Sequence, residues 1–201
     1  MPDHYFSLSD KSEGSYREKG SKFLAYAYSV SSETEVQQHL ADLKKLHHTA
    51  RHHCYAFVLK PQPGQEETYR ASDDGEPPHS AGDPILGQIR SYRLLDVLVV
   101  VVRYFGGTKL GVAGLINAYK TAAADALSNS VILEKYVERT ISVEFDYAAT
   151  SAVMKIIDHY SLTIIDQAFT EICYYYLSVR LRDYEAALAG FSALEQVKVK
   201  H

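Results

Sequence analysis

A glycine-rich turn at residues 103–115 carries the clearest chemical signal of this sequence, and it reads Arg-Tyr-Phe-Gly-Gly-Thr-Lys-Leu-Gly-Val-Ala-Gly-Leu. A buried strand is expected before this turn and a helix after it. The first N–H groups of a helix lack partners within the helix and form the positive end of its dipole, and glycines let an anion approach the backbone. We therefore predict a site for phosphate or a nucleic-acid backbone. Its candidate residues are Lys22, Arg103, Gly106, Gly107, Lys109 and Gly111.

The same turn has a second interpretation, which the sequence leaves open. Glycines also suit a tight corner between a strand and a helix, where positive φ angles and close packing are required. The spacing matches neither a P-loop nor a dinucleotide-binding fingerprint. The turn is therefore a candidate for binding, for architecture, or for both.

An acidic loop at residues 72–82 is the second candidate. Its side chains with chemical potential are Asp73, Asp74, Glu76 and Ser80. Carboxylates beside small residues can hold a hard cation with phosphate oxygens or transfer protons. The Asp-Gly and Glu-Pro pairs also favour plain turns, and the spacing is not that of an EF-hand. Because ligand loops gather at one end of a sheet, we expect this loop to border a cleft floored by Arg103 and Lys109.

A histidine-rich stretch, residues 47–54, ends in Cys54. Histidines near a thiol suggest zinc, but no matching second pair of ligands follows at the expected spacing, so we interpret the stretch as structural. The sequence has two cysteines, Cys54 and Cys173. We expect both to be reduced and to lie on strands of different domains. We assign no catalytic residue, no metal and no cofactor.

The elements that must position these residues follow from periodicity and turn signals. A capping pattern at Ser32 and Glu35 starts a helix, and a nearly continuous apolar run marks a strand that is covered on both faces. Thr68 to Arg70 is expected to pair with the strand before it. The expected strands are residues 5–8, 21–30, 54–59 and 94–105, and the expected helices are residues 33–48, 85–92 and a segment from the glycine-rich turn to 128–129.

A second unit is expected from residue 137, with a boundary between Ser130 and Val137. Alternating and helical patterns follow in the order βαββαβ, which is the ferredoxin-like layout. Its open sheet face would carry Ser142, Glu144, Asp146, Tyr174, Tyr176, Arg180, Lys198 and Lys200. This face is suited to stacking RNA bases or to docking on the first domain. We predict an α+β chain with domains at residues 1–133 and 137–201.

The composition is that of an ordinary globular protein. The chain has 201 residues, 46% of them hydrophobic, and a net charge of −4, so a phosphate-binding surface has to be local. The longest apolar run, Val97–Val102, is far shorter than the ~20 residues of a membrane-spanning helix. Neither a basic patch nor an apolar stretch marks a signal at the N-terminus, and we expect a cytoplasmic protein without a membrane.

The chain resembles the Impact/YigZ family over about residues 15–125. The resemblance implies a first domain similar to the second domain of ribosomal protein S5. It implies a ferredoxin-like second domain similar to the C-terminal domain of elongation factor G. Asn117 departs from the pattern, because an arginine is often expected there. The stretches that carry the resemblance are residues 19–23, 52–56, 73–77 with 81–82, and 103–107 with 109–111.

The resemblance implies a link to translation, since eukaryotic relatives regulate it. We therefore predict a non-catalytic protein associated with nucleic acid or the ribosome, or with a translation-related protein. The alternative is an enzyme of phosphoryl transfer or phosphate-ester chemistry. It would use Gly106, Gly107 and Gly111 for phosphate, with Asp73 or Asp74 on magnesium. The oligomeric state is left open.

Overall fold

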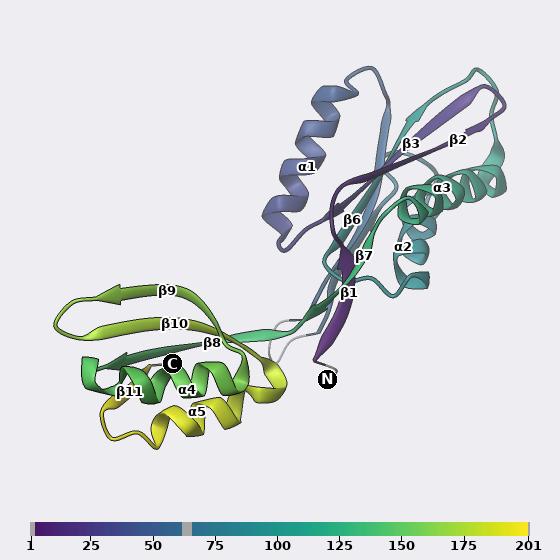
Figure 1. Cartoon of the computed structure of the whole chain (residues 1–201). Helices are drawn as coiled ribbons and strands as arrows, with labels where there is room; N and C mark the ends of the chain where they lie inside the picture. Colours follow the sequence, from purple (N-terminus) through teal and green to yellow (C-terminus); the bar gives the residue numbers. More distant parts are fainter. Residues whose placement is uncertain (1–2, 62–65, 201) are drawn as a thin grey trace. The chain divides into compact units, whose positions relative to one another are not determined.

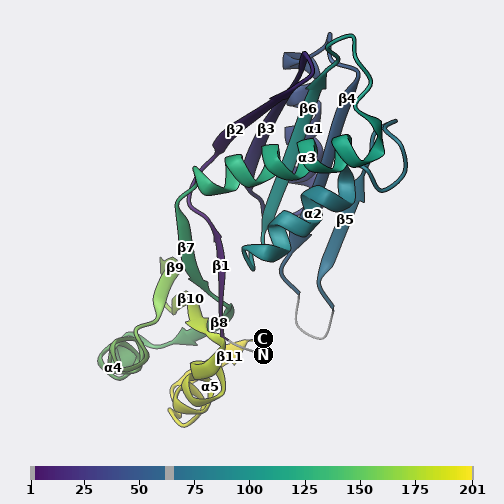
Figure 2. The ribbon, with the colours of Figure 1, turned by 90° about the vertical axis from the view of Figure 1, so that its right-hand side faces the viewer.

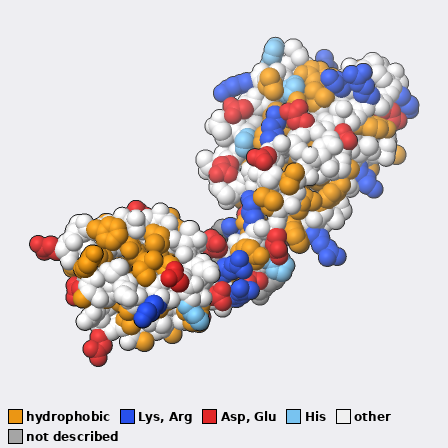
Figure 3. All heavy atoms as spheres, viewed as in Figure 1, with side chains coloured by type: hydrophobic (Ala, Val, Ile, Leu, Met, Phe, Trp, Pro, Cys, Tyr) orange, Lys and Arg blue, Asp and Glu red, His pale blue; other side chains and the backbone are white. Residues whose placement is uncertain are grey.

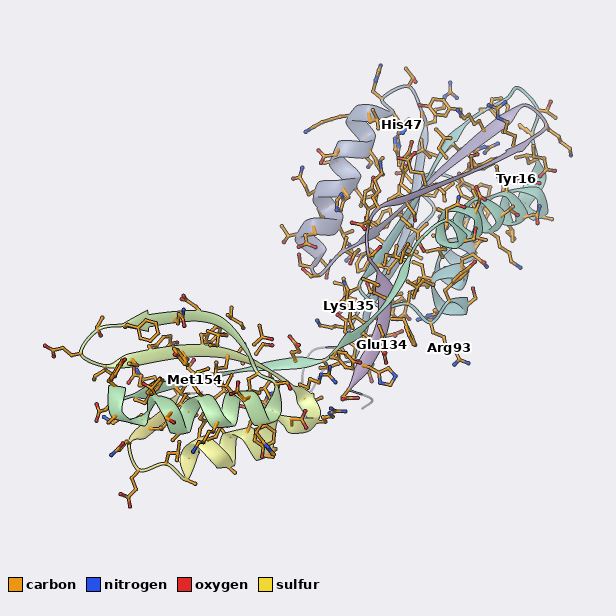
Figure 4. All side chains as sticks on the ribbon, in the orientation of Figure 1. Tyr16, His47, Arg93, Glu134, Lys135 and Met154 are labelled. Atoms are coloured by element: carbon orange, nitrogen blue, oxygen red, sulfur yellow. The ribbon has the colours of Figure 1, made fainter. Side chains whose placement is uncertain are left out.

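A computed structural model describes residues 3–61 and 66–200, so Pro63 of the proline-rich segment lies outside the described residues. The chain is a mixed α/β protein that divides into two compact units (Figure 1). One unit is Phe6–Glu134, and the other begins at Lys135 and includes the first residues up to Tyr5. The division falls within β7 (Ile132–Tyr136), which pairs with β1 (His4–Leu8); Glu134 and Lys135 are labelled in Figure 4. Independent folding of residues 137–201 stays a prediction.

The first unit is built on a five-stranded sheet in the order β2-β3-β6-β4-β5, in which all neighbours are antiparallel. The central strand, β6, is buried from Val97 to Arg103, as the continuous apolar run predicts. The register pairs His52 with Arg103, so the start of β4 lies beside the end of β6. The strands are β2 (Ser12–Glu18), β3 (Ser21–Ser29), β4 (His52–Leu59), β5 (Thr68–Ser72) and β6 (Val97–Tyr104).

Helices cover both faces of this sheet. Figure 2 shows α2 (Gly82–Ser91) and α3 (Gly111–Ser128) on one face, and α1 (Glu33–Leu46) lies on the other. The inner face of α1 places Val36, Leu40 and Leu43 in a core with aromatic and branched residues of β3, β4 and β6. The α2 and α3 helices share a larger core with the opposite sheet face. Both sheet faces are therefore buried, which fixes the ends of β6 and α3 relative to each other.

The structure differs from the sequence expectations at β2, α2 and α1, and the first two differences have a physical cause. The β2 strand was not predicted, because its strand character comes from a distant contact: a Cβ on Gly14 would lie 2.2 Å from the backbone nitrogen of Ala126 in α3. The α2 helix begins at Gly82 rather than Ile85, because Asp73 accepts the N–H groups of Ala81 and Gly82. The α1 helix ends at Leu46 rather than His48.

The second unit has the element order βαββαβ, with sheet order β11-β8-β10-β9. Its first and third strands are central, as the pattern predicts. Inward residues of β8 and β10 form a core with α4 and α5. The elements are β8 (Glu138–Phe145), α4 (Thr150–Tyr160), β9 (Thr163–Phe169), β10 (Cys173–Arg180), α5 (Tyr184–Ser192) and β11 (Val197–Lys200), with short 3₁₀ turns at Tyr147–Ala149 and Leu181–Asp183.

The other face of this second sheet is internally paired. The hydroxyl of Tyr174 donates to the Ser142 hydroxyl at 3.2 Å, and Lys200 forms an ion pair with Glu144. Arg180 stacks on Tyr136, with 3.6 Å between the guanidinium carbon and the ring centre. Two of the cations on this face, Lys200 and Arg180, therefore already have partners, which reduces what the face offers to RNA phosphates.

Candidate anion-binding cleft

A cavity of about 500 Å³ opens in the first unit where β6 passes into α3. Its size is that of a typical small-molecule pocket. The glycine-rich turn and the acidic loop both contribute to its wall, through Gly111 and Glu76. The lining residues are Arg51, His52, Glu76, Pro77, Arg103, Phe105, Lys109, Leu110, Gly111, Val112 and Leu115.

The glycines of the turn serve two different purposes. Gly106 packs on the backbone of the β2–β3 turn: a Cβ there would lie 1.8 Å from the carbonyl carbon of Gly20, and its N–H donates to the Ser21 hydroxyl at 3.1 Å. Gly107 and Gly111 have φ angles of +89° and +74°, and a Cβ on either would meet no atom within 4 Å. Gly106 is therefore required by close packing at the strand–helix corner. Gly107 and Gly111 instead give the backbone positive φ angles at positions where a side chain would meet no other atom.

The start of α3 faces solvent without a cap. Leu110 occupies the N-cap position, no side chain accepts a hydrogen bond there, and the first turn has no acidic residue. Gly111, Val112 and Ala113 are exposed. The first N–H groups of an α-helix have no partners within the helix, so this end of α3 presents donors and partial positive charge to the cavity.

Arg103 lies at the base of the cavity and is only 6% exposed. Its Nη1 donates to Oε1 of Glu76 at 2.5 Å, and the hydroxyl of Tyr119 donates to the same oxygen at 2.8 Å. Burial, with Cys54 and Glu76 nearby, raises the pKa of the Tyr119 hydroxyl above its ordinary value, so it stays protonated and donates. Within the described residues, Nε of Arg103 has no hydrogen-bond partner. The sequence predicts Arg103 as a cation of the phosphate site, and in the structure Glu76 neutralises it in part.

The exposed cations of the cavity are Arg51 and Lys109. Together with Arg103 they face one carboxylate, Glu76, so the cavity is locally positive in a chain of net charge −4. Elsewhere, on the face that Figure 3 shows, acidic and basic side chains are interspersed. Lys22 does not line this cavity; it borders another one beside the β2–β3 turn.

The acidic loop is held by its own backbone. Asp73 accepts N–H groups from Gly82, His79 and Ala81 at 2.8, 2.8 and 2.9 Å. Burial alone would raise the pKa of the Asp73 carboxyl, but these donors hold that pKa below its ordinary value. Asp74 accepts the N–H of His53 at 2.7 Å.

Neither Asp73 nor Asp74 lines the cavity, and the Ser80 hydroxyl donates to the carbonyl of Pro77 at 2.6 Å. The carboxylates that the enzyme alternative places on magnesium therefore organise the loop and the start of α2. Of the loop candidates, only Glu76 reaches the cavity wall.

The histidine-rich stretch supports the sheet. Nε2 and Nδ1 of His47 lie 2.8 Å from the hydroxyls of Tyr26 and Tyr104, beside the end of α1 (Figure 4). Burial, followed by the charge of Lys22, lowers the pKa of His47. No three His, Cys, Asp or Glu side chains in the described part of the chain gather as a metal-binding group.

Both cysteines are free thiols and lie in different units, as predicted. The Cys54 thiol is buried 3.0 Å from the carbonyl of Asp73, and burial raises its pKa. It therefore stays protonated at neutral pH and is a poor nucleophile.

The sequence did not predict that Arg51 and Phe105 line the cavity, or that Tyr119 binds Glu76 at its base. Nothing in the local sequence shows that the hydroxyl of Tyr119, on the buried face of α3, meets Glu76. Arg51 reaches the cavity through the pairing of β4 with β6, a contact between residues far apart in the sequence. Phe105 was the available signal, because it is an aromatic residue directly before the paired glycines of a candidate phosphate site.

The geometry defines a two-unit α/β protein with an uncapped helix start over a locally positive cavity. The Impact N-terminal domain model matches residues 19–127, which include every residue of the cavity wall. The chain belongs to the Impact family, as its motifs predicted. No helix among the described residues is long and apolar enough to cross a membrane.

Two relatives share much of the sequence. IMPACT family member YvyE of Bacillus subtilis is 36% identical over 147 residues, which is 73% of this chain and 66% of that protein. An IMPACT family member of Haemophilus influenzae is 34% identical over 169 residues, which is 84% of this chain and 81% of that protein. The chain thus spans just under two thirds of the first relative and most of the second.

One solved structure shares the fold over nearly the whole chain. A crystal structure described as that of an hypothetical protein matches with a TM-score of 0.71 at 24% identity, covering 99% of this chain and 97% of the other. A structure described as the two-domain translational regulator Yih1 matches at a TM-score of 0.39 and 27% identity, covering 65% and 48% of the two chains. The first match shows the fold alone, and nothing is concluded from the second.

Proposed function

We propose that this chain is a non-catalytic binding protein for phosphate groups of RNA or the ribosome, acting in the regulation of translation. The observation that carries the proposal is the cavity at the start of α3. There the uncapped helix end, Lys109 and Arg51 surround one opening. Helix N-termini combined with cations are ready-made sites for phosphate. The link to translation rests on the family resemblance and on no contact in this chain.

The proposal also covers the fold family of each unit and the cellular location of the protein. The first unit would be similar to the second domain of ribosomal protein S5, and the second would be ferredoxin-like, similar to the C-terminal domain of elongation factor G. The element order βαββαβ with central β8 and β10 supports the latter. A cytoplasmic location is part of the same proposal.

A binding role fits the cavity better than phosphoryl transfer. A phosphoryl-transfer site needs carboxylates that can hold magnesium beside the phosphate. Asp73 and Asp74 accept backbone N–H groups instead, and Glu76 already accepts hydrogen bonds from Arg103 and Tyr119. The described cavity wall therefore supplies cations and N–H donors, which bind, and its one carboxylate, Glu76, is already paired.

Co-sedimentation with ribosomes and with ribosomal RNA, across a salt series, tests this function. The proposal predicts association at 50 mM salt that weakens steeply towards 200 mM, because phosphate contacts release condensed counterions. Incubation with ATP and magnesium should give no turnover. Absence of salt-sensitive association with either ribosomes or RNA would contradict the proposal, and steady ATP turnover would favour the enzyme.

A further inference from the structure

The wall of the cavity is mostly apolar, which a phosphate alone does not require. Phe105 and Val112 are 54% and 51% exposed, although both are apolar and line the opening. Pro77, Leu110 and Leu115 complete the apolar side. A ligand that matches this wall carries a flat apolar surface as well as an anion.

Phe105 also lies at the junction of two cavities. A second cavity of about 370 Å³ is lined by Thr49, Arg51, Arg103, Tyr104 and Phe105. The two cavities thus share Arg51, Arg103 and Phe105. The guanidinium carbon of Arg103 is 5.6 Å from the ring centre of Phe105, so a cation lies over the ring while more than half of the side chain is open to solvent.

Arg103 adds a second observation at this opening. Its side chain is more than nine-tenths buried, yet Nε has no partner within the described residues. A buried donor without a partner is costly, and such groups in folded proteins usually await a ligand or water. Arg103 lines both cavities, so its guanidinium lies beside any anion that enters next to Phe105.

We propose that the cavity binds one unstacked nucleotide, with its base against Phe105 and its phosphate at the start of α3 beside Lys109 and Arg51. This inference rests on the proposed function and names the ligand of the same site. Aromatic side chains stack on bases of any sequence, and cations follow the phosphates. A paired duplex keeps its bases stacked and cannot present one to Phe105, so the ligand is single-stranded nucleic acid or a free nucleotide.

Fluorescence anisotropy of a labelled 12-nucleotide oligouridine tests this inference on the full chain. The variants are Phe105→Ala and Phe105→Leu, the second of which keeps apolar bulk but removes the aromatic face. Phe169→Ala is the matched control, because Phe169 is 57% exposed and lies in the other unit. Urea unfolding of each variant checks that folding is retained.

Both Phe105 variants should weaken oligouridine binding by about 5- to 150-fold, the range of one lost base–aromatic stack. Phe169→Ala should leave it unchanged, and a duplex of equal length should bind less tightly than the single strand. AMP should compete better than inorganic phosphate. Full competition by AMP identifies a free nucleotide as sufficient, and competition only by oligomers identifies a strand that spans both cavities.

The inference is overturned if Phe105→Ala binds as wild type does while Lys109→Ala binds more weakly, because the site then holds phosphate without a base. Equal affinity for duplex and single strand would also overturn it. If neither Phe105→Ala nor Lys109→Ala changes binding, the cavity is not the binding site, and the observation that carries the proposed function fails. The two failures are therefore distinguishable.

Discussion

Arg103 and Glu76 form a buried ion pair, 2.5 Å from Nη1 to Oε1, which joins the end of β6 to the acidic loop. Both residues lie in motifs that sequence analysis singled out for chemistry. The pair ties the two motifs together at the base of the cavity. Tyr119 of α3 donates to the same carboxylate, so strand, loop and helix meet at one oxygen atom.

Replacing Glu76 with Gln should lower the free energy of unfolding by about 3–5 kcal/mol, because it leaves Arg103 charged and buried without its counter-ion. Urea denaturation measures this change. Glu67→Gln is the matched control: Glu67 pairs with Arg90 at 3.0 Å but at the surface, so its loss should cost less than about 1 kcal/mol. Equal effects of the two variants would show that the Glu76 pair does not stabilise the cavity base.

Replacing each of two neighbouring glycines with alanine should lower the free energy of unfolding by different amounts. Gly107→Ala strains only a positive φ angle and should cost about 1–2 kcal/mol. Gly106→Ala should cost more, since its Cβ would overlap the backbone of Gly20 and force the corner open. Urea unfolding of both variants tests this order. A larger loss for Gly107→Ala than for Gly106→Ala would refute the close-packed corner.

Asp73 should stabilise the fold in a pH-dependent way. Because its folded-state pKa is lowered, the carboxylate contributes stability above its unfolded pKa of about 4, and that contribution is lost as pH falls through the folded value. Asp73→Ala should cost about 0.5–2 kcal/mol at pH 7, as for other helix caps. The difference from wild type should shrink at pH 3. A difference that stays constant from pH 7 to pH 3 would contradict this role.

Much of the first unit could be predicted, where local signals and burial agree. The hydroxyl of Ser32 accepts the N–H of Glu35, and the valine run becomes the central strand. The β2 strand could not be predicted, because Gly14 is specified by a helix more than a hundred residues away. A local sequence pattern does not predict such a contact.

The candidate site was predicted in part, for the same reason. The glycine-rich turn and the acidic loop do meet at one cavity, and Lys109 lines it. Lys22 was predicted at this site because of its positive charge. The start of β3, which carries Lys22, lies at another cavity. Arg51 depends on the β4–β6 register, and the partner of Arg103 depends on loop packing. These pairings become visible only in three dimensions.

Lys109→Ala tests the central claim most directly, because Lys109 is exposed and its loss should leave stability unchanged. Lys120→Ala is the matched control, an exposed lysine of the same helix outside the cavity wall. Affinity for oligouridine should be measured for both variants from 50 to 200 mM salt. The account predicts that Lys109→Ala binds more weakly, with a salt slope shallower by about 0.7, while Lys120→Ala matches wild type. Wild-type affinity and slope in Lys109→Ala would contradict it, and the glycine-rich turn would then be a structural corner alone.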